Sequence, residues 1–383
     1  MALSNKGAAL LLTGGALFAL SACGGSGAVP SGPAELGNAA SQLSRTTADA
    51  SPADSTSILK KLTKNVVIGS TVDPGNGDMG PRGLSIAPIK YGVPKGELAV
   101  CNFEDSSGAA GKGTTIELLD PKAGSSPSTF AQSSKIAGCD GVAFTNSDGI
   151  YAGGMTTGLL VAFSNSGKLS KTYGPPFKEP FSNTDASNPG LYAAEYMFTS
   201  DATTGTVVSF SINQYGNKKR LEVVSGFAVN KASGWGALGP SGIQYYPKKD
   251  TLYVADGVTN TIVSFNNASE LLVKDEIVVQ SGGKTFKCKY PKTTCGTLVY
   301  AGKDLNAPVA MTVLPNGNLI VANSKGGNKL IELTPTGTVL ATKVVDSKKT
   351  PGVFGLIASG KNDTDTVLFY TDTNDNSLHE LEQ

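Results

Sequence analysis

The sequence is poor in charged side chains and in histidine. Charged residues make up 16% of the 383 residues, and 32 basic against 31 acidic side chains leave a formal net charge of +1. A surface balanced in this way gives no reason to expect a nucleic-acid partner. Because His379 is the only histidine, the chain cannot supply a histidine pair as general bases or as transition-metal ligands.

Long apolar runs and zinc motifs are also missing. The N-terminal apolar run, residues 8–20, contains Gly14 and Gly15 and is shorter than the ~20 residues that a membrane-spanning helix needs. No Cys-x-x-Cys pair or Cys/His cluster suggests a zinc site. The sequence is instead rich in glycine, with 47 residues, and in short Val, Thr and Ile runs. This composition is typical of a turn-rich, all-β protein.

The N-terminus has the layout of a signal peptide, with Lys6, an apolar run and the small residues Ser21 and Ala22. Leu20-Ser21-Ala22-Cys23 resembles the lipobox of bacterial lipoproteins, whose cysteine is lipidated and becomes the new N-terminus. The resemblance implies a signal peptide over residues 1–22, palmitate or a related acyl group on Cys23, and a lipid-anchored protein of the bacterial cell envelope, outside the cytoplasm. The alternative is plain secretion with an incidental cysteine, although Leu20 is poorly placed for ordinary secretory cleavage.

Residues 23–56 are mostly Gly, Ser, Ala, Pro and Thr. Such a segment buries too little apolar surface to fold and behaves as a flexible tether. We therefore expect a lipidated, disordered linker over residues 23–56 and a folded domain over residues 57–383.

The domain repeats a unit of short β-branched strands separated by turns. The clearest unit combines residues 239–243, 252–256 and 261–265, and a similar unit follows at residues 307–333. One Asp, Asn or Gly ends the second strand of every unit, at Asn102, Gly153, Asp201, Asp256, Asn323 and Asp372. A spacing of roughly 50 residues is usual for the blades of a β-propeller.

The six repeat units predict an all-β, six-bladed β-propeller. The unit around Asp201 is degenerate, because residues 188–195 fit its second strand nearly as well as residues 198–201. Seven blades are the alternative, if residues 180–235 contain a further unit. The chain stops after the third strand of the last unit, and residues 65–72 form an additional strand. That strand could complete the last blade and close the ring.

Four cysteines follow Cys23, and an even number in an exported chain indicates disulfides. Cys288 and Cys295 enclose a short segment and are expected to pair, so that Cys101 and Cys139 pair with each other or remain buried thiols. The Cys288–Cys295 segment falls in the longest interval between two of the residues that end second strands. It is therefore expected on a loop between blades. Its lysines could contact an anionic surface or could simply be solvated.

The units beginning at Pro240 and Pro308 look like NHL repeats, with Leu252-Tyr253-Val254-Ala255-Asp256 in the first and Val321-Ala322-Asn323 in the second. The resemblance covers residues 81–383 and implies the gluconolactonase/NHL-type propeller superfamily. That superfamily includes lactonases, paraoxonase-like hydrolases, streptogramin lyases and binding modules. It therefore supports the fold more than any chemistry.

In such propellers one mouth receives both the turn before each first strand and the turn after each second strand. We expect five oxygen-bearing side chains there: Asp140, Asn102, Asp256, Asn323 and Asp372. They could hold Ca²⁺, as in the lactonase-like members, or each could start a turn by binding its own backbone. The turn interpretation is favoured because four of them follow the repeat. Asp140 departs from it and is the strongest single candidate.

These features favour a binding or interaction module whose ligand is a protein, a glycan or a small molecule. The alternative is a Ca²⁺-dependent lactonase of the gluconolactonase type. We assign no catalytic residue and no cofactor other than that Ca²⁺. A Ser–His–Asp triad would require His379 to point into the mouth, whereas strand alternation allows the opposite orientation equally well.

Overall fold

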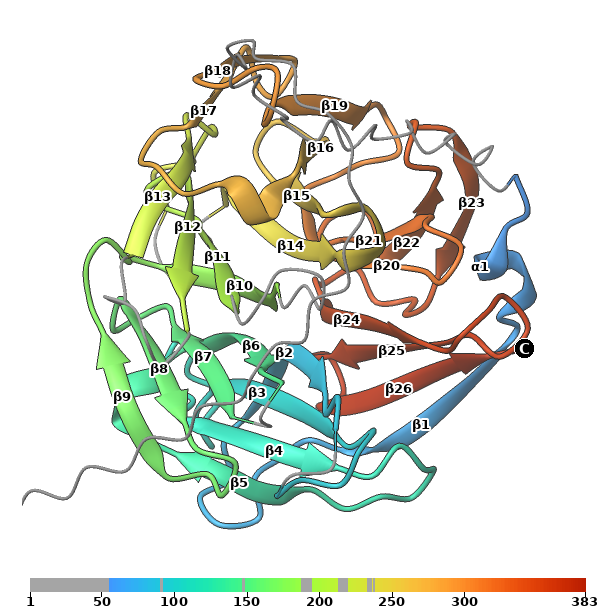
Figure 1. Cartoon of the computed structure of the whole chain (residues 1–383). Helices are drawn as coiled ribbons and strands as arrows, with labels where there is room; N and C mark the ends of the chain where they lie inside the picture. The colour runs from blue at the N-terminus through green and yellow to red at the C-terminus, as the bar shows by residue number, and fades with distance from the viewer. Residues whose placement is uncertain are drawn as a thin grey trace, which may run out of the picture. The chain divides into compact units, whose positions relative to one another are not determined.

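Six blades arranged in a ring make up the folded domain, and five of them are four-stranded sheets (Figure 1). The computed structural model describes residues 55–89, 92–146, 149–186, 195–212, 220–232, 236 and 238–383. Cys23, the signal peptide and nearly all of the linker lie outside these residues. The prediction of an all-β, six-bladed propeller is confirmed, and the described residues form six sheets rather than seven.

Each blade has four repeat strands in order from the centre outwards, and four of the six blades take them from consecutive strands of the chain. The fourth blade is interrupted by an inserted hairpin, and the sixth takes its outermost strand from the N-terminal end of the domain. The first three blades are β2 (Met79–Ile86), β3 (Leu98–Glu104), β4 (Thr115–Leu119), β5 (Ser128–Gln132); β6 (Cys139–Phe144), β7 (Ile150–Gly154), β8 (Leu159–Phe163), β9 (Leu169–Tyr173); and β10 (Pro180–Asp185), β11 (Tyr196–Asp201), β12 (Thr206–Ser211), β13 (Arg220–Ser225). The last three are β14 (Pro240–Tyr246), β15 (Thr251–Asp256), β16 (Thr261–Asn266), β19 (Gly296–Ala301); β20 (Pro308–Val313), β21 (Leu319–Asn323), β22 (Lys329–Leu333), β23 (Val339–Val344); and β24 (Val353–Ser359), β25 (Val367–Asp372), β26 (Ser377–Glu382), β1 (Lys64–Ser70).

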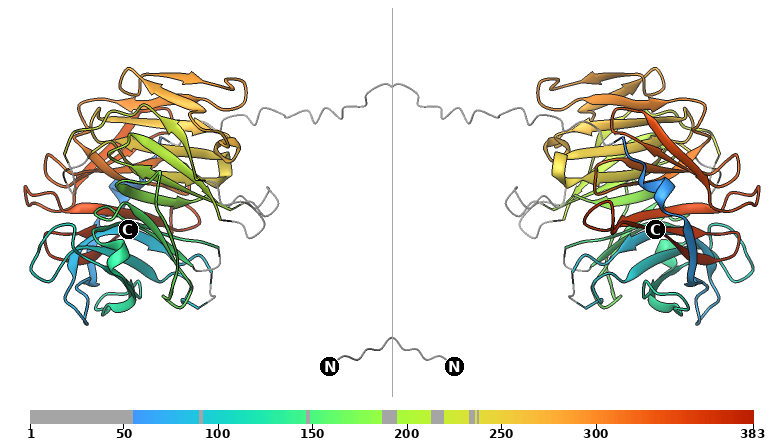
Figure 2. Two further views of the ribbon diagram at one scale, coloured as in Figure 1. Left: turned by 90° about the vertical axis from the view of Figure 1, so that its left-hand side faces the viewer. Right: turned by 90° about the vertical axis from the view of Figure 1, so that its right-hand side faces the viewer.

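The N-terminal strand closes the ring. β1 pairs antiparallel with β26, from Lys64 opposite Glu382 to Ser70 opposite Ser377, and the two strands run side by side in Figures 1 and 2. The last blade therefore joins the two ends of the folded domain. β1 covers the edge of the sheet that β26 would otherwise expose.

A short helix, α1 (Ile58–Lys61), precedes β1 and contacts β23 of the neighbouring blade. Its N-terminus is held by the buried carboxylate of Glu332 in β22, which accepts hydrogen bonds from Ser57 Oγ (2.6 Å) and from the Leu59 amide (2.8 Å). No helix among the described residues has the length and apolar character that crossing a membrane requires.

The unit around Asp201 and the inserted segment both depart from a simple repeat of four strands. β11 begins at Tyr196, so the second strand of the third blade is the one around residues 198–201, and residues 188–194 lie outside the described part.

The expectation of a loop between blades for the Cys288–Cys295 segment is wrong. The insertion leaves the fourth blade between β16 and β19 and forms a hairpin, β17 (Ile277–Gln280) and β18 (Thr285–Cys288). β17 pairs in parallel with β13, which extends the third blade to six strands.

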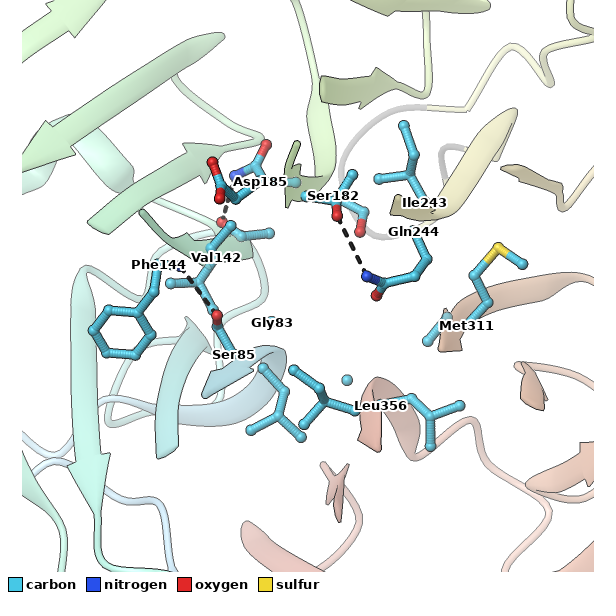
Figure 3. Close-up of a pocket in the computed structure, with 18 of the residues that line it drawn as sticks. Gly83, Ser85, Val142, Phe144, Ser182, Asp185, Ile243, Gln244, Met311 and Leu356 are labelled. Atoms are coloured by element: carbon cyan, nitrogen blue, oxygen red, sulfur yellow. Dashed lines mark hydrogen bonds between the residues drawn. The ribbon is translucent and has the colours of Figure 1, made fainter. Parts of the chain in front are cut away.

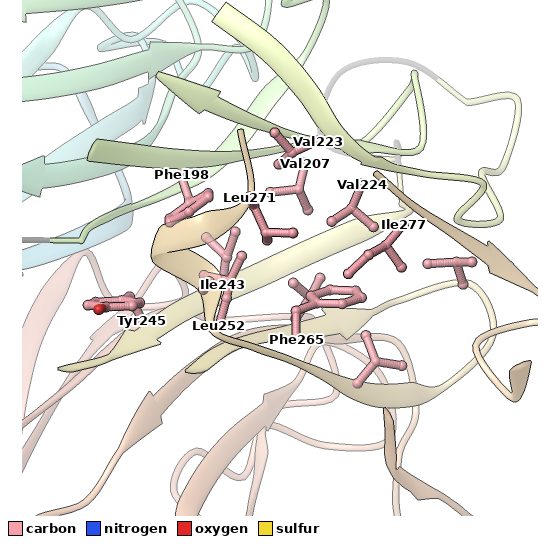
Figure 4. Packing of buried hydrophobic residues seen from close by; sticks show 14 of the residues in the cluster. Phe198, Val207, Val223, Val224, Ile243, Tyr245, Leu252, Phe265, Leu271 and Ile277 are labelled. Atoms are coloured by element: carbon pink, nitrogen blue, oxygen red, sulfur yellow. The ribbon is translucent and has the colours of Figure 1, made fainter. Parts of the chain in front are cut away.

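Apolar side chains between neighbouring sheets form the core. Where the third blade meets the fourth, Phe198, Val207 and Val224 pack against Ile243, Leu252 and Phe265 (Figure 4). Ile277 of the inserted hairpin joins the same cluster. Burying each such side chain contributes about 1.5–3 kcal/mol, so the parallel pairing of β17 is supported by packing as well as by hydrogen bonds.

Both pairs of cysteines after Cys23 form disulfides. Cys101 of β3 is bonded to Cys139 of β6, which ties the first blade to the second. Cys288 is bonded to Cys295 across the end of the inserted hairpin. Two disulfides are consistent with an extracytoplasmic location.

Candidate functional site

A cavity of about 460 Å³ lies in the centre of the ring. Its walls are the innermost strands of all six blades, β2, β6, β10, β14, β20 and β24 (Figure 3). Because the six strands converge there, each blade contributes three to six lining residues. The volume is within the range of small-molecule sites, ~300–1,000 Å³.

The cavity wall is mixed, with polar and apolar groups in nearly equal shares. Leu84, Val142, Ile243, Met311 and Leu356 are among its apolar members. The side chain of Gln244 projects into the space between them, and its Nε2 lies 3.5 Å from Thr184 Oγ1 (Figure 3).

The charges of the cavity wall are carboxylates. Asp140 and Asp185 are its charged members, and no lysine, arginine or histidine occurs among the described residues that line it. Asp185 ends β10 and is partly buried. A wall of this kind favours ligands that carry positive charge or hydrogen-bond donors over anions.

Arg82 and Asp140 form a buried ion pair at the inner end of the cavity. Arg82 Nη1 lies 3.4 Å from Asp140 Oδ2, and both side chains are at most 5% exposed. The guanidinium is sandwiched between two rings, 3.6 Å from the centroid of Phe103 and 4.2 Å from that of Phe354. Burial raises the pKa of Asp140 to about 6, and the charge of Arg82 opposes this shift. Burial also lowers the pKa of Arg82, although a guanidinium remains protonated in proteins.

Apolar side chains from around the ring pack beside this ion pair. The cluster comprises Phe103, Met155, Phe181, Ala202 and Val309, with Leu238 and Phe354 against it. The Arg82 guanidinium therefore pairs with the Asp140 carboxylate and stacks its two faces against aromatic rings. Asp140, the strongest single candidate from the sequence, lies at the centre of the ring as expected, but its carboxylate is paired with a cation.

The other four mouth candidates form hydrogen bonds with their own turns or with neighbouring loops. Asp256 Oδ1 accepts hydrogen bonds from the amides of Val258 (2.8 Å) and Thr259 (3.1 Å), and Asp372 Oδ1 accepts one from Asn374 (2.9 Å). Asn323 Oδ1 accepts the Asn306 amide at 3.0 Å. Asn102 donates to the carbonyl of Thr71 at 2.8 Å. The turn interpretation describes Asp256 and Asp372, and the structure does not bring the four side chains together around one ion.

His379 lies in the sixth blade, away from the residues that line the cavity. Its ring stacks on Tyr370, with centroids 4.8 Å apart, and its Nε2 lies 2.6 Å from Ser377 Oγ and 3.2 Å from Asp375 Oδ2. Asp372, Asp375 and His379 are the one group of three His, Cys, Asp or Glu residues in the described part whose ligand atoms lie within 4.8 Å of one another. Ser377 and Asp375 contact the same ring nitrogen, whereas a catalytic triad requires them on opposite ones.

The sequence reasoning missed the cavity residues Gln244, Asp185 and Met311. They lie in the second half of their inner strands, whereas the repeat markers sit at the ends of the second strands. Their only signal in the sequence is their place on the first strand of their unit.

Comparisons with known proteins identify propeller structures with a similar fold. No family model matches the chain, and no curated protein matches its sequence. The PQQ domain of a pyranose dehydrogenase from Coprinopsis cinerea superposes with a TM-score of 0.54 and 11% identity, over 84% of this chain and 97% of that one. A gluconolactonase from Xanthomonas campestris gives a TM-score of 0.52 and 11% identity, over 83% and 89%. Identities this low show a shared propeller fold and leave the activity open.

Proposed function

We propose that the protein is a binding module that takes a small, partly apolar molecule with a positive charge into the central cavity. The observation that carries this proposal is the composition of the cavity wall, apolar side chains from all six blades with carboxylates and no basic group among its described members. Asp140 is paired with Arg82, and Asp185 is the second carboxylate of the wall. The apolar wall would hold the body of the ligand, and Gln244 and Asp185 would orient its polar end.

A lactonase is the weaker proposal for this chain. It requires carboxylates and an amide converging on one ion at the centre, and the mouth candidates instead bind their own turns or, for Asp140, Arg82. The likeness to a gluconolactonase of 11% identity supports the fold alone.

A matched pair of ligands tests the binding proposal. 4-Phenylbutylamine and 4-phenylbutyrate share a frame and carry opposite charges, and titration calorimetry on the purified protein measures both. We expect the amine to bind about tenfold more tightly than the acid, which corresponds to ~1.4 kcal/mol. Asp185→Asn should remove this preference. Equal affinities for the two compounds, or a preference for the acid, would contradict the proposal.

We further propose that Cys23 is acylated and anchors the propeller to a membrane of the cell envelope through the linker. The lipobox-like residues 20–23 support this, as do the two disulfides. One acyl chain holds a protein only marginally, and two or more give a stable anchor.

Replacing Cys23 by serine tests the anchor. In a bacterial host fed with labelled palmitate, the wild-type protein should take up label and sediment with membranes. Cys23→Ser should do neither, because serine offers no thiol for acylation. Uptake of label by Cys23→Ser, or a soluble wild-type protein, would rule the anchor out.

A further inference from the structure

Glu117 of β4 is a buried carboxylate at a position where four other blades carry an apolar residue. It lies opposite Val100, two residues before the marker residue Asn102. The corresponding residues of blades two to five are Ala162, Val208, Val263 and Ile331. Glu117 is 0% exposed. A carboxylate buried in this way is costly unless hydrogen bonds or a cation compensate it.

Hydrogen bonds do not compensate Glu117. Neither of its carboxylate oxygens has a hydrogen-bond donor. The Thr115 hydroxyl lowers the pKa of Glu117, whereas the contact with the Asp73 carboxyl group raises it. Glu332, which is equally buried, shows the contrast. It accepts hydrogen bonds from Ser57, Ile58, Leu59 and Asn318.

The neighbours of Glu117 add negative charge. The loop between β1 and β2 brings up Asp73, which accepts hydrogen bonds from Thr129 Oγ1 and from the Gly75 amide (2.8 Å), and Asp78, which accepts the Thr114 amide at 2.6 Å. Burial, and then the charge of Asp73, raise the pKa of Glu117 to about 8. Burial acts on Asp73 as well, but the hydrogen bonds from Thr129 and the backbone amides hold its pKa below the usual range.

Positive charge is missing from this cluster. Asp73, Asp78 and Glu117 are each at most 4% exposed. Among the described residues, no lysine or arginine forms an ion pair with them or contributes to the pKa shifts of Asp73 and Glu117.

Asn102 supplies a second, independent oxygen without a partner. Its Nδ2 donates to Thr71 O (2.8 Å) and to Thr115 Oγ1 (3.2 Å), which leaves its buried Oδ1 without a donor. Asn102 and Val100 point to the same face of the sheet because they are two residues apart on β3. Since Glu117 lies opposite Val100, Asn102 Oδ1 and the Glu117 carboxylate are on that one face.

We propose that Asp73, Glu117 and Asn102 Oδ1 form a buried site for a hard divalent cation, with Ca²⁺ as the ion, and that Asp78 adds charge beside it. Ca²⁺ takes six to eight oxygen ligands, including carboxylates and amide carbonyls. The ion would balance the buried carboxylates and hold the loop that follows the ring-closing strand β1. This site lies in the first blade and is independent of ligand binding in the central cavity.

Calorimetric titration of the chelator-treated protein with CaCl₂ tests the site, with thermal unfolding as a second readout. We expect one ion per chain, a higher Tm with Ca²⁺, and an affinity reduced at least about tenfold in Glu117→Gln. Asp73→Asn serves as a second variant with the same expected loss. Glu332→Gln, at an equally buried glutamate with hydrogen bonds, and Asp256→Asn, at the mouth, should bind Ca²⁺ as the wild type does.

Two results would overturn the proposal. The first is the absence of both binding heat and Tm shift in the wild type at millimolar Ca²⁺, which would make Glu117 and Asp73 a pair that shares a proton. The second is binding that survives Glu117→Gln and Asp73→Asn but fails in Asp256→Asn, which would place the ion at the mouth. Neither result bears on the amine titration of the central cavity.

Discussion

Asp140→Ala should lower the free energy of unfolding by about 3–5 kcal/mol, because it leaves a buried guanidinium without its counter-ion. Arg82 and Asp140 are 5% and 3% exposed, and Arg82 is enclosed by Phe103 and Phe354. Water therefore cannot replace the carboxylate at low cost. Equilibrium unfolding in urea, monitored by circular dichroism, measures the change.

Two further variants separate the burial of the charge from its pairing. Arg82→Met combined with Asp140→Leu removes both charges, and we expect it to recover most of the loss, as apolar replacement of buried ion pairs often does. Asp120→Ala removes the partner of Lys122 in a pair that is 54% and 77% exposed, and it should cost below ~1 kcal/mol. A cost of the same size for Asp120→Ala and Asp140→Ala would contradict the argument from burial.

Removing the Cys101–Cys139 disulfide should destabilise the propeller more than removing Cys288–Cys295. The first closes a separation of 38 residues and joins two blades, while the second closes a separation of 7 within one insertion. Restriction of the unfolded chain gives about 4 kcal/mol for the longer loop and ~2–3 kcal/mol for the shorter one. The paired variants Cys101→Ala/Cys139→Ala and Cys288→Ala/Cys295→Ala test this order by thermal unfolding. A larger loss for the shorter loop would contradict it.

The blades could be predicted because their signals are local. Short β-branched strands, intervening turns and the residue that ends each second strand recur from unit to unit, so counting the units gives the number of blades. The disulfide between Cys288 and Cys295 followed in the same way from a short separation in sequence. The second disulfide stayed open because Cys101 and Cys139 become neighbours only when two blades pack together.

The inserted hairpin could not be placed from its sequence. Its pairing with β13 sets Val224 opposite Ile277, residues far apart in the chain whose contact no local pattern encodes. The loss of loop entropy in such a contact is offset by packing against Phe265 and neighbouring residues of the core.

The sites were the least predictable part. The repeat pattern points to Asn102 as an oxygen-bearing residue, but its place beside Glu117 depends on strand register and on the loop that follows β1. Glu117 did carry a signal, a carboxylate where four other units have Ala, Val or Ile. The cavity depends on which half of each inner strand faces the centre, and alternation alone does not decide this.

The most direct test of ligand binding in the central cavity is the affinity of 4-phenylbutylamine for Gln244→Trp. Gln244 projects into the cavity (Figure 3), so an indole there should fill the space and weaken the amine by at least about tenfold. Val344→Trp, at a side chain that is 57% exposed in the fifth blade, should bind the amine as the wild type does. Unchanged affinity in Gln244→Trp would place the ligand elsewhere and contradict the account.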